Sequence, residues 1–335
     1  MPPQFESAGS DSRSFFAALI GEGRPLLTLT GLCLIFSGGF ALFQSATGHF
    51  LPHDVDFLGM TPQELCMAVA GGTAESGREM EGCRVVQFMF YDRVAFGGAL
   101  IAVGILHLWL AEFPLRQGEA WAWWTFLLSG AVGFGSFLAY LGYGYLDTWH
   151  GVATLFLLPC FVLGLARTLA LVKPPRHIRR LTLPSAPLNL RSAAGIGRLC
   201  LLATALGMVF GGGTILVVGM TTVFVPQDLQ FMGLAANDLH TINPRLVPLI
   251  AHDRAGFGGG IFTCGWLVLL CVWCGRASRS LWQALALSGS AGFACAIGVH
   301  FAVGYTDFFH LAPAIVGSIS FIFGLALSYR PMRAG

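Results

Sequence analysis

The sequence is short of charge. Only 11% of its 335 residues are Asp, Glu, Lys or Arg, whereas 55% are hydrophobic. Soluble domains carry roughly 25% charged residues, so this composition excludes a water-soluble globular protein. The net charge of +2 offers no basic surface, and no nucleic-acid partner is expected. The composition instead predicts a polytopic membrane protein whose main partner is the lipid bilayer.

No cleavable signal peptide is expected, because residues 1–24 are polar and no small-residue cleavage pattern follows the first apolar run. Eight apolar runs are long enough to cross a hydrocarbon core of roughly 30 Å. Lipid offers the backbone no hydrogen-bond partners, so each run is predicted to be a helix. The expected spans are 25–47, 94–111, 121–143, 151–172, 199–224, 255–274, 282–305 and 311–329.

Basic residues are scarce on one side of this predicted topology. With a cytoplasmic N-terminus, 14 of the 19 basic residues fall in cytoplasmic segments and 12 of the 17 acids fall outside. The formal charges are then +9 inside and −7 outside. Since cytoplasmic loops collect Lys and Arg, both termini are predicted to be cytoplasmic. The expected location is the plasma (cytoplasmic, or inner) membrane, with multiple passes.

The two halves of the chain resemble each other. The matched segments are 50–54 (FLPHD) with 224–228 (FVPQD), 91–98 (YDRVAFGG) with 252–259 (HDRAGFGG), and 144–150 (GYLDTWH) with 304–310 (GYTDFFH). Each half has four spans, an even number, so both halves enter the membrane in the same direction. The predicted fold is an all-α integral membrane protein of eight transmembrane helices in two parallel four-helix repeats.

The predicted organisation has five parts. A basic, proline-containing cytoplasmic linker separates two four-helix repeats, and short cytoplasmic tails flank them. In chain order these parts are the tail 1–24, the first repeat 25–172, the linker 173–198, the second repeat 199–329 and the tail 330–335.

No acidic or basic residue is expected in the middle of a span. Coupled carriers usually need one there, so the pattern weighs against a proton- or sodium-coupled carrier. The polar residues that the halves share gather instead at the predicted outer face, where the second and fourth spans of each half begin. Four aspartates are expected to cap these helix N-termini: Asp92, Asp147, Asp253 and Asp307.

Two arginines fit this capping hypothesis less well. Arg93 and Arg254 would stand in a first helical turn, where the helix dipole disfavours a cation, and on the side that is poor in basic residues. Each therefore needs an anionic partner. One interpretation is a bridge from Arg93 to Asp147 and from Arg254 to Asp307. The other is a site for a lipid phosphate or a substrate carboxylate, which guanidinium binds in a bidentate way.

An outer binding site would combine these groups with two histidines that exchange protons near pH 7. Its candidate residues are Asp92, Arg93, Asp147, His150, Asp253, Arg254, Asp307 and His310. Imidazole and carboxylate are also zinc or copper ligands, although no compact signature of the HExxH kind is present. The candidate metal ligands, all in the second half, are His252, Asp253, His300, Asp307 and His310.

Seven of the nine cysteines lie inside apolar runs, where a thiol behaves as a small hydrophobe. Cys66 and Cys83 share a polar loop on the predicted outer side, where a disulfide is one of two equal possibilities. A CxxC pair near the outer face, which quinone-linked thiol oxidoreductases need, is absent from the sequence.

Three functions fit these patterns. The favoured one is a membrane protein that binds or transports a small anionic or amphiphilic molecule through a polar extracytoplasmic site. The first alternative is a metal-assisted or acid–base membrane enzyme that acts on a lipidic substrate. The second is a non-catalytic subunit of a larger complex, in which the matched residues hold helices together.

Overall fold

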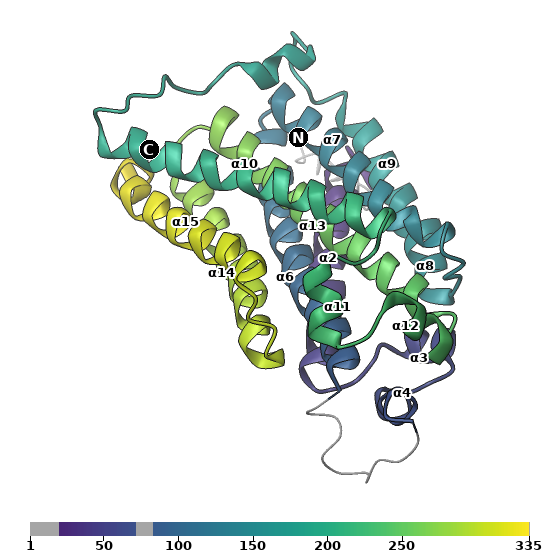
Figure 1. The fold of residues 1–335 in the computed structure, drawn as a ribbon. Coiled ribbons are helices and arrows are strands. Elements are labelled where there is room, and N and C mark those ends of the chain that lie inside the picture. Colours follow the sequence, from purple (N-terminus) through teal and green to yellow (C-terminus); the bar gives the residue numbers. More distant parts are fainter. Residues whose placement is uncertain (1–19, 72–82, 335) are drawn as a thin grey trace, which may run out of the picture.

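The computed structural model describes residues 20–71 and 83–334, and all regular elements in these ranges are helical. Most of the predicted N-terminal tail (1–19) lies outside them. Eight helices are long and apolar enough to cross a membrane, so the chain is a multi-pass membrane protein. They are α2 (Arg24–Ala46), α6 with η1 (Arg84–Leu115), α7 with η2 (Ala120–Leu141), α8 through η3 to α9 (Thr148–Thr168), α10 (Ala193–Met220), α13 (Leu246–Cys274), α14 (Arg279–Val303) and α15 (Phe308–Ala334) (Figure 1).

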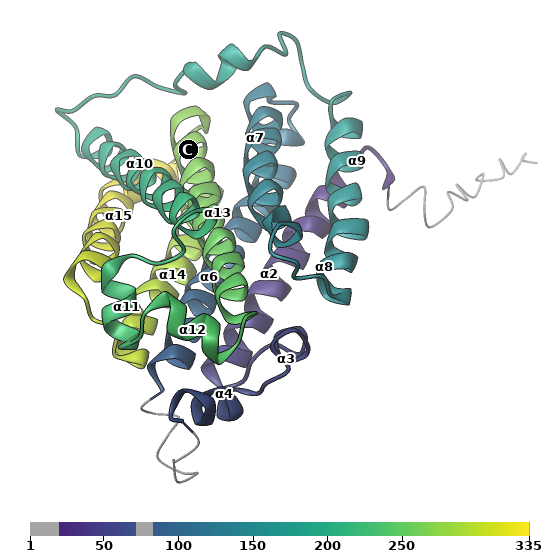
Figure 2. The same cartoon turned by 45° about the vertical axis from the view of Figure 1, so that its right-hand side comes forward.

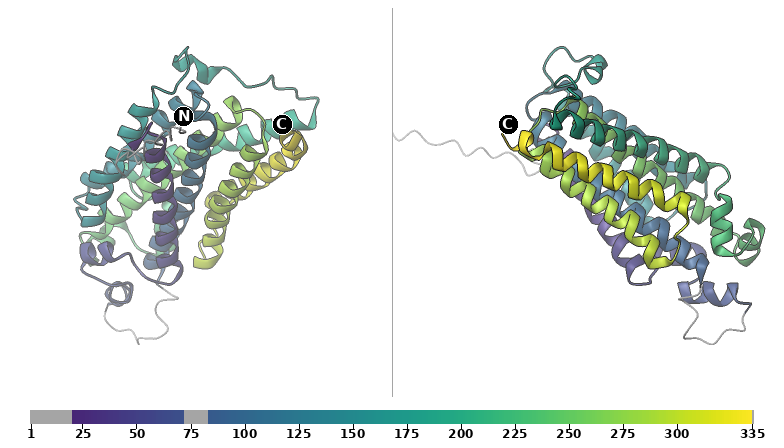
Figure 3. Two further views of the ribbon diagram at one scale, coloured as in Figure 1. Left: turned by 180° about the vertical axis from the view of Figure 1, so that it is seen from behind. Right: turned by 60° about the vertical axis from the view of Figure 1, so that its left-hand side comes forward.

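Short helices gather at one end of the bundle. α3 (Pro52–Leu58) and α4 (Pro62–Val69) precede α6, while α11 (Pro226–Met232) and α12 (Ala236–Ile242) precede α13. The connection from α9 to α10, which contains η4 (Ile178–Thr182), lies at the opposite end (Figures 1, 2 and 3). These two ends are called the short-helix end and the linker end.

α6 and α13 form the centre of the bundle. About 67% of the α6 span and 72% of the α13 span are buried, against 17–33% for the other six. Each packs against the preceding long helix of its own half, α2 on α6 and α10 on α13. In addition, α14 packs on α6 and α7 packs on α13, so each central helix also contacts the opposite half.

Glycines allow these central contacts to be close. A Cβ on Gly97 of α6 would lie 2.7 Å from the carbonyl oxygen of Gly38 on α2. A Cβ on Gly212 of α10 would lie 2.8 Å from the carbonyl oxygen of Gly258 on α13. Such distances are too short for a real side chain, so any larger residue would push the helices apart. In lipid, helices gain no hydrophobic driving force from packing together, so close contacts between small residues stabilise these crossings instead.

Two of the predicted spans start too late. They were expected to begin at 94 and 255, but α6 begins at Arg84 and α13 at Leu246. The residues just before each acid–arginine pair are largely apolar and continue the helix. The charges therefore lie near the third turn, roughly 11–14 Å from the helix start at 1.5 Å per residue, and neither cap a helix nor occupy a first turn. This corrects the prediction for Asp92, Arg93, Asp253 and Arg254.

The matched segments 50–59 and 224–233 adopt the same local structure. α3 and α11 each begin with proline and end at a glycine with positive φ. Asp54 accepts a hydrogen bond from the Leu51 backbone N–H at 2.9 Å, and Asp228 accepts one from Val225 at 2.8 Å. Both carboxylates are almost fully buried, at 1% and 0% exposure. Each of these aspartates therefore caps a short helix and at the same time places a carboxylate inside the bundle.

The two cysteines of the polar loop are bonded to each other. A disulfide joins Cys66 of α4 to Cys83, the residue before α6, with the Cα atoms 5.6 Å apart. It ties the short-helix end to a central helix. Residues 72–82, between them, lie outside the described ranges.

Candidate functional site

Two arginines on the central helices link the halves of the molecule. Arg93 of α6 donates from Nε to Asp253 of α13 at 2.9 Å, and from Nη1 to Asp54. Arg254 of α13 donates from Nε to Asp92 of α6 at 3.2 Å. Both arginine side chains are at most 6% exposed. Each central helix thus contributes one arginine and one aspartate to the buried ion pairs that join the two helices.

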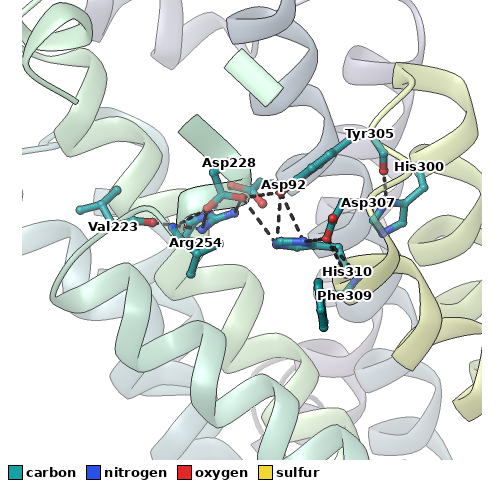
Figure 4. A network of polar contacts seen from close by, with 10 residues as sticks. Asp92, Val223, Asp228, Arg254, His300, Tyr305, Asp307, Phe309 and His310 are labelled. Atoms are coloured by element: carbon teal, nitrogen blue, oxygen red, sulfur yellow. Dashed lines mark hydrogen bonds and ion pairs between the residues drawn. The ribbon is translucent and has the colours of Figure 1, made fainter. Parts of the chain in front are cut away.

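Arg254 is well supplied with acceptors (Figure 4). Its two Nη atoms donate to both oxygens of Asp228, at 2.5 and 2.9 Å, and Nη1 also donates to the carbonyl oxygen of Val223 at 3.1 Å. The Phe88 ring centroid lies 4.8 Å from the guanidinium carbon, and Tyr305 donates to Asp228 at 2.8 Å. These contacts describe a structural ion pair with bidentate geometry.

Arg93 is bonded less completely. Its Nη2 is buried and has no hydrogen-bond partner within the described ranges. Asp54 binds only Nη1 of Arg93 and uses its other oxygen to accept from Tyr145. A buried donor without an acceptor costs roughly 1–3 kcal/mol, so this atom is a place where a ligand oxygen would be stabilised.

Three histidines surround the Arg93 side. His150 Nδ1 binds Asp147, whose carboxylate also accepts from the Trp149 backbone N–H at 2.7 Å and so caps α8 as expected. His150 Nε2 lies 3.1 Å from Nε2 of His252, and the His53 ring packs edge-on against His150 with centroids 5.4 Å apart. With neutral rings, His150 Nδ1–H donates to Asp147 and His252 Nε2–H donates to His150. This leaves the buried His252 Nδ1 as an acceptor with no donor in the described part of the chain.

Burial and hydrogen bonding shift the pKa values of ionisable groups outside the spans. Burial lowers the pKa of His53 below its ordinary value of 6.5, so the ring is neutral at pH 7. Burial, followed by the nearby Asp54 charge, raises the pKa of Tyr145, which keeps its hydroxyl as a donor. On the other side, the hydrogen bond from His310 lowers the pKa of Asp307.

The Arg254 side has its own histidines (Figure 4). Asp307 accepts from backbone N–H groups at the start of α15 and from His310 Nδ1 at 2.8 Å. His310 Nε2 lies 3.6 Å from Asp228. His300 Nδ1 instead hydrogen-bonds the carbonyl oxygen of Tyr305. Asp307 is therefore a helix cap, in agreement with the capping prediction.

The predicted Arg93–Asp147 and Arg254–Asp307 bridges are not formed. Both arginines lie deeper in the bundle than these caps and pair with other carboxylates. The candidate metal ligands are also not brought together, because some lie on the Arg93 side and some on the Arg254 side. Among the residues that the structure describes, no three His, Cys, Asp or Glu side chains are arranged to hold a metal ion. The zinc or copper interpretation of His252, Asp253, His300, Asp307 and His310 thus lacks support.

A cavity of about 170 Å³ lies beside Arg93, between α2, α6, α7, α8 with η3, and α13. Its lining on α6 has the three- and four-residue spacing of one helix face. These residues are Arg93, Phe96, Leu100, Val103 and His107. Phe40 and Trp149 also line it and are 46% and 51% exposed, so the cavity reaches the surface of the bundle at these side chains. For scale, an engineered cavity of about 150 Å³ admits benzene.

Both ends of the cavity are polar and its middle is largely apolar, with Ser37 and Ser136 as the exceptions. The end near α3 has His53, His150 and His252 beside Arg93. The end nearer the linker has His107, Ser129 and Thr263. An arrangement of this kind accommodates an elongated molecule with an apolar body.

Several residues of the two clusters were not candidates from the sequence. Asp54, Asp228, Tyr145 and Tyr305 complete the hydrogen bonding around the arginines. All four stand in segments that the two halves share, so the match between the halves was the signal that could have found them.

Comparison with protein-family models, with curated proteins and with solved structures finds no match. The fold and the site define a multi-pass membrane protein of eight apolar helices with a buried arginine–aspartate network.

Proposed function

We propose that this protein binds an amphiphilic molecule of the membrane in the cavity beside Arg93. The observation that carries the proposal is a largely apolar cavity, two of whose lining residues, Arg93 and His252, each have a buried unpaired atom, Nη2 and Nδ1. The first needs an acceptor and the second needs a donor. A head group that supplies both, attached to an apolar body, would complete the site.

Electrostatics favours an uncharged head group over an anion. The buried network has two guanidinium groups and four carboxylates (Asp54, Asp92, Asp228 and Asp253), so its formal charge is −2. Adding an anion to this excess in a medium of low dielectric constant is unfavourable. Of the two ligand classes that the sequence suggested, the amphiphile therefore fits better than the small anion. A hydroxyl or a protonated acid group both donates and accepts.

We also infer that the halves are parallel repeats with cytoplasmic termini. The like structures of α3 and α11, and the reciprocal partners of Arg93 and Arg254, support the duplication. The concentration of Arg near the linker end supports a cytoplasmic linker. The Arg93 end of the cavity then faces the extracytoplasmic leaflet of the plasma (inner) membrane.

Acid–base chemistry on the bound amphiphile is a second candidate. It is favoured by the chain from Asp147 through His150 to His252, because His252 lines the cavity and its Nδ1 is unpaired. The Asp147 side chain is 11% exposed, so this chain would connect the cavity to solvent for proton exchange. The hypothesis that matched residues merely hold helices together describes the Arg254 cluster well.

Two matched glycines provide the test. Gly133 lines the cavity, and a Cβ added there would meet Thr263 Oγ1 at 3.5 Å. Its counterpart Gly292 faces Ala102, at 3.7 Å from an added Cβ. Both distances are ordinary van der Waals contacts, so both positions accept a Cβ. Gly133→Val fills the cavity, whereas Gly292→Val is the matched control.

The measurement is the amphiphile retained by protein purified from membranes in mild detergent, extracted with organic solvent and quantified by mass spectrometry. Wild type and Gly292→Val should retain a compound enriched over bulk lipid. Gly133→Val should retain roughly tenfold less, the effect of about 1.4 kcal/mol of lost binding energy. No enriched amphiphile in wild type, or equal retention by Gly133→Val, contradicts the proposal.

A further inference from the structure

We infer that the linker-proximal end of the cavity is a second polar site, which binds a hydroxyl group at the far end of the ligand. His107 of α6, Ser129 of α7 and Thr263 of α13 form this distal site. The inference rests on the proposed amphiphile binding and adds the chemical class of the ligand.

The distal site contains two buried polar atoms that need a partner. His107 and Thr263 are each 3% exposed and both line the cavity. His107 Nδ1 and Thr263 Oγ1 have no hydrogen-bond partner in the described portion of the chain. Polar groups buried in this way destabilise a protein unless an occupant bonds to them.

The fold itself does not need these polar groups. At the positions that match His107 and Thr263, the other half of the chain has Val268 and Ala102. Those two residues are buried in the same central helices, at 2% and 0% exposure. Apolar side chains therefore serve the packing of α6 and α13 at these two positions, and their polar replacements, His107 and Thr263, lie beside the cavity.

The existing hydrogen bonds determine which group the distal site accepts. Ser129 Oγ donates to the Phe126 carbonyl oxygen at 3.2 Å, so it accepts Nε2–H of His107 at 3.3 Å. In a neutral ring the Nδ1 atom of His107 is then a lone pair that needs a donor, while the Thr263 hydroxyl can donate. A ligand hydroxyl satisfies both, because it donates to His107 and accepts from Thr263. A ketone or carboxylate cannot donate, and an ammonium group cannot accept.

The separation of the two polar ends determines the shape of the ligand. Arg93 and His107 are 14 positions apart on α6, which is roughly 21 Å at 1.5 Å per residue. Phe96, Leu100 and Val103 line the same face between them. The ligand is therefore a long, slender amphiphile with a hydrogen-bonding group at one end and a hydroxyl at the other.

The test compares hexadecanediol, which has a hydroxyl at each end, with hexadecanol, which has one. Binding is measured from the rise in melting temperature of the purified protein over a series of probe concentrations. Wild type should bind the diol roughly tenfold more tightly. The double variant His107→Val/Thr263→Ala carries the residues of the other half and should bind both probes equally. Ser288 is the counterpart of Ser129 in the other half and lies outside the distal site. The control variant Ser288→Ala should therefore keep the preference for the diol.

A second readout checks that the double variant is folded. Without a probe, His107→Val/Thr263→Ala should show a single cooperative melting transition, as wild type does. Equal binding of both probes by wild type, or a diol preference that survives in the double variant, overturns the distal site and leaves the proposed function standing. Binding of neither probe to wild type overturns the amphiphile cavity as well.

Discussion

The two matched arginines show that the same residue acquires different roles from its neighbours. Arg254 binds Asp228 through both Nη atoms, whereas Arg93 binds Asp54 through Nη1 alone and keeps a buried, unpaired Nη2. At the position where Tyr91 stands in the first half, the second half has His252, which lines the cavity beside Arg93. Differences at a few such positions make one side a structural ion pair and the other a candidate site.

His53 makes the stability of the Arg93 side depend on pH. Its counterpart on the Arg254 side is Gln227, which does not titrate. Burial lowers the pKa of His53 below 6.5, so the unfolded chain binds this proton more readily than the folded protein. The contribution of His53 to stability is complete above about pH 6.5 and is lost as the pH falls below that value. Between about pH 7.5 and about pH 5, the melting temperature of His53→Gln should therefore fall less steeply than that of wild type.

The control for this titration is His240→Gln, which removes an exposed histidine of α12. Its melting temperature should follow the wild-type curve at every pH. Equal slopes for His53→Gln and wild type would show that His53 is protonated in the folded protein as readily as in the unfolded chain.

At the scale of elements, α6 and α13 are joined by charge as well as by packing. Helices in lipid gain little from hydrophobic association, so close glycine contacts and buried polar pairs specify which helices meet. The reciprocal pairs Arg93–Asp253 and Arg254–Asp92 form only when α6 and α13 lie side by side in register. Asp54 and Asp228 add the short helices α3 and α11 to the same network.

Removing one cation from this network should cost more than removing one acid. Arg254→Gln leaves Asp92 and Asp228 without their cation and should lower stability by about 3–5 kcal/mol. Asp92→Asn should cost less, because it reduces the excess negative charge of the network. The check is the melting temperature of both variants in the same detergent. An equal fall for the two would refute the charge balance described above.

At the scale of the whole molecule, a chain with two matched sequence halves carries its candidate site beside Arg93. The cavity lies among α2, α6, α7, α8 and α13, so it is built from both halves although it lies beside Arg93 alone. Its lining reaches the bundle surface at Phe40, within the apolar span of α2, where a molecule could enter from lipid. Its polar groups at both ends favour a molecule that lies along the helices.

The proposed orientation is testable on intact cells. Asn237→Cys on α12 and Pro187→Cys in the connection before α10 are both exposed positions, at opposite ends of the bundle. A membrane-impermeant thiol reagent should label Asn237→Cys in intact cells and Pro187→Cys only after permeabilisation, with unsubstituted protein as the background. The reverse pattern would place the Arg93 end of the cavity on the cytoplasmic side.

The sequence by itself determined the eight helices and their approximate positions. Long apolar runs in lipid must satisfy their own backbone hydrogen bonds, so length and composition leave no other structure. Most predicted ends agree within a few residues with α2, α7, α14 and α15. The aspartate caps at 147 and 307 were also predictable, because capping is local chemistry.

Only the tertiary structure decided which acids meet Arg93 and Arg254. In the sequence, a charged residue at the edge of an apolar run indicates the end of a helix. Here the helix continues past the charge, which is buried because its partner comes from the opposite half. The same holds for His107 and Thr263, which are isolated polar residues in apolar spans until the helices pack around one cavity. Ion pairing and cavity shape are long-range properties, whereas helix formation in lipid is a local one.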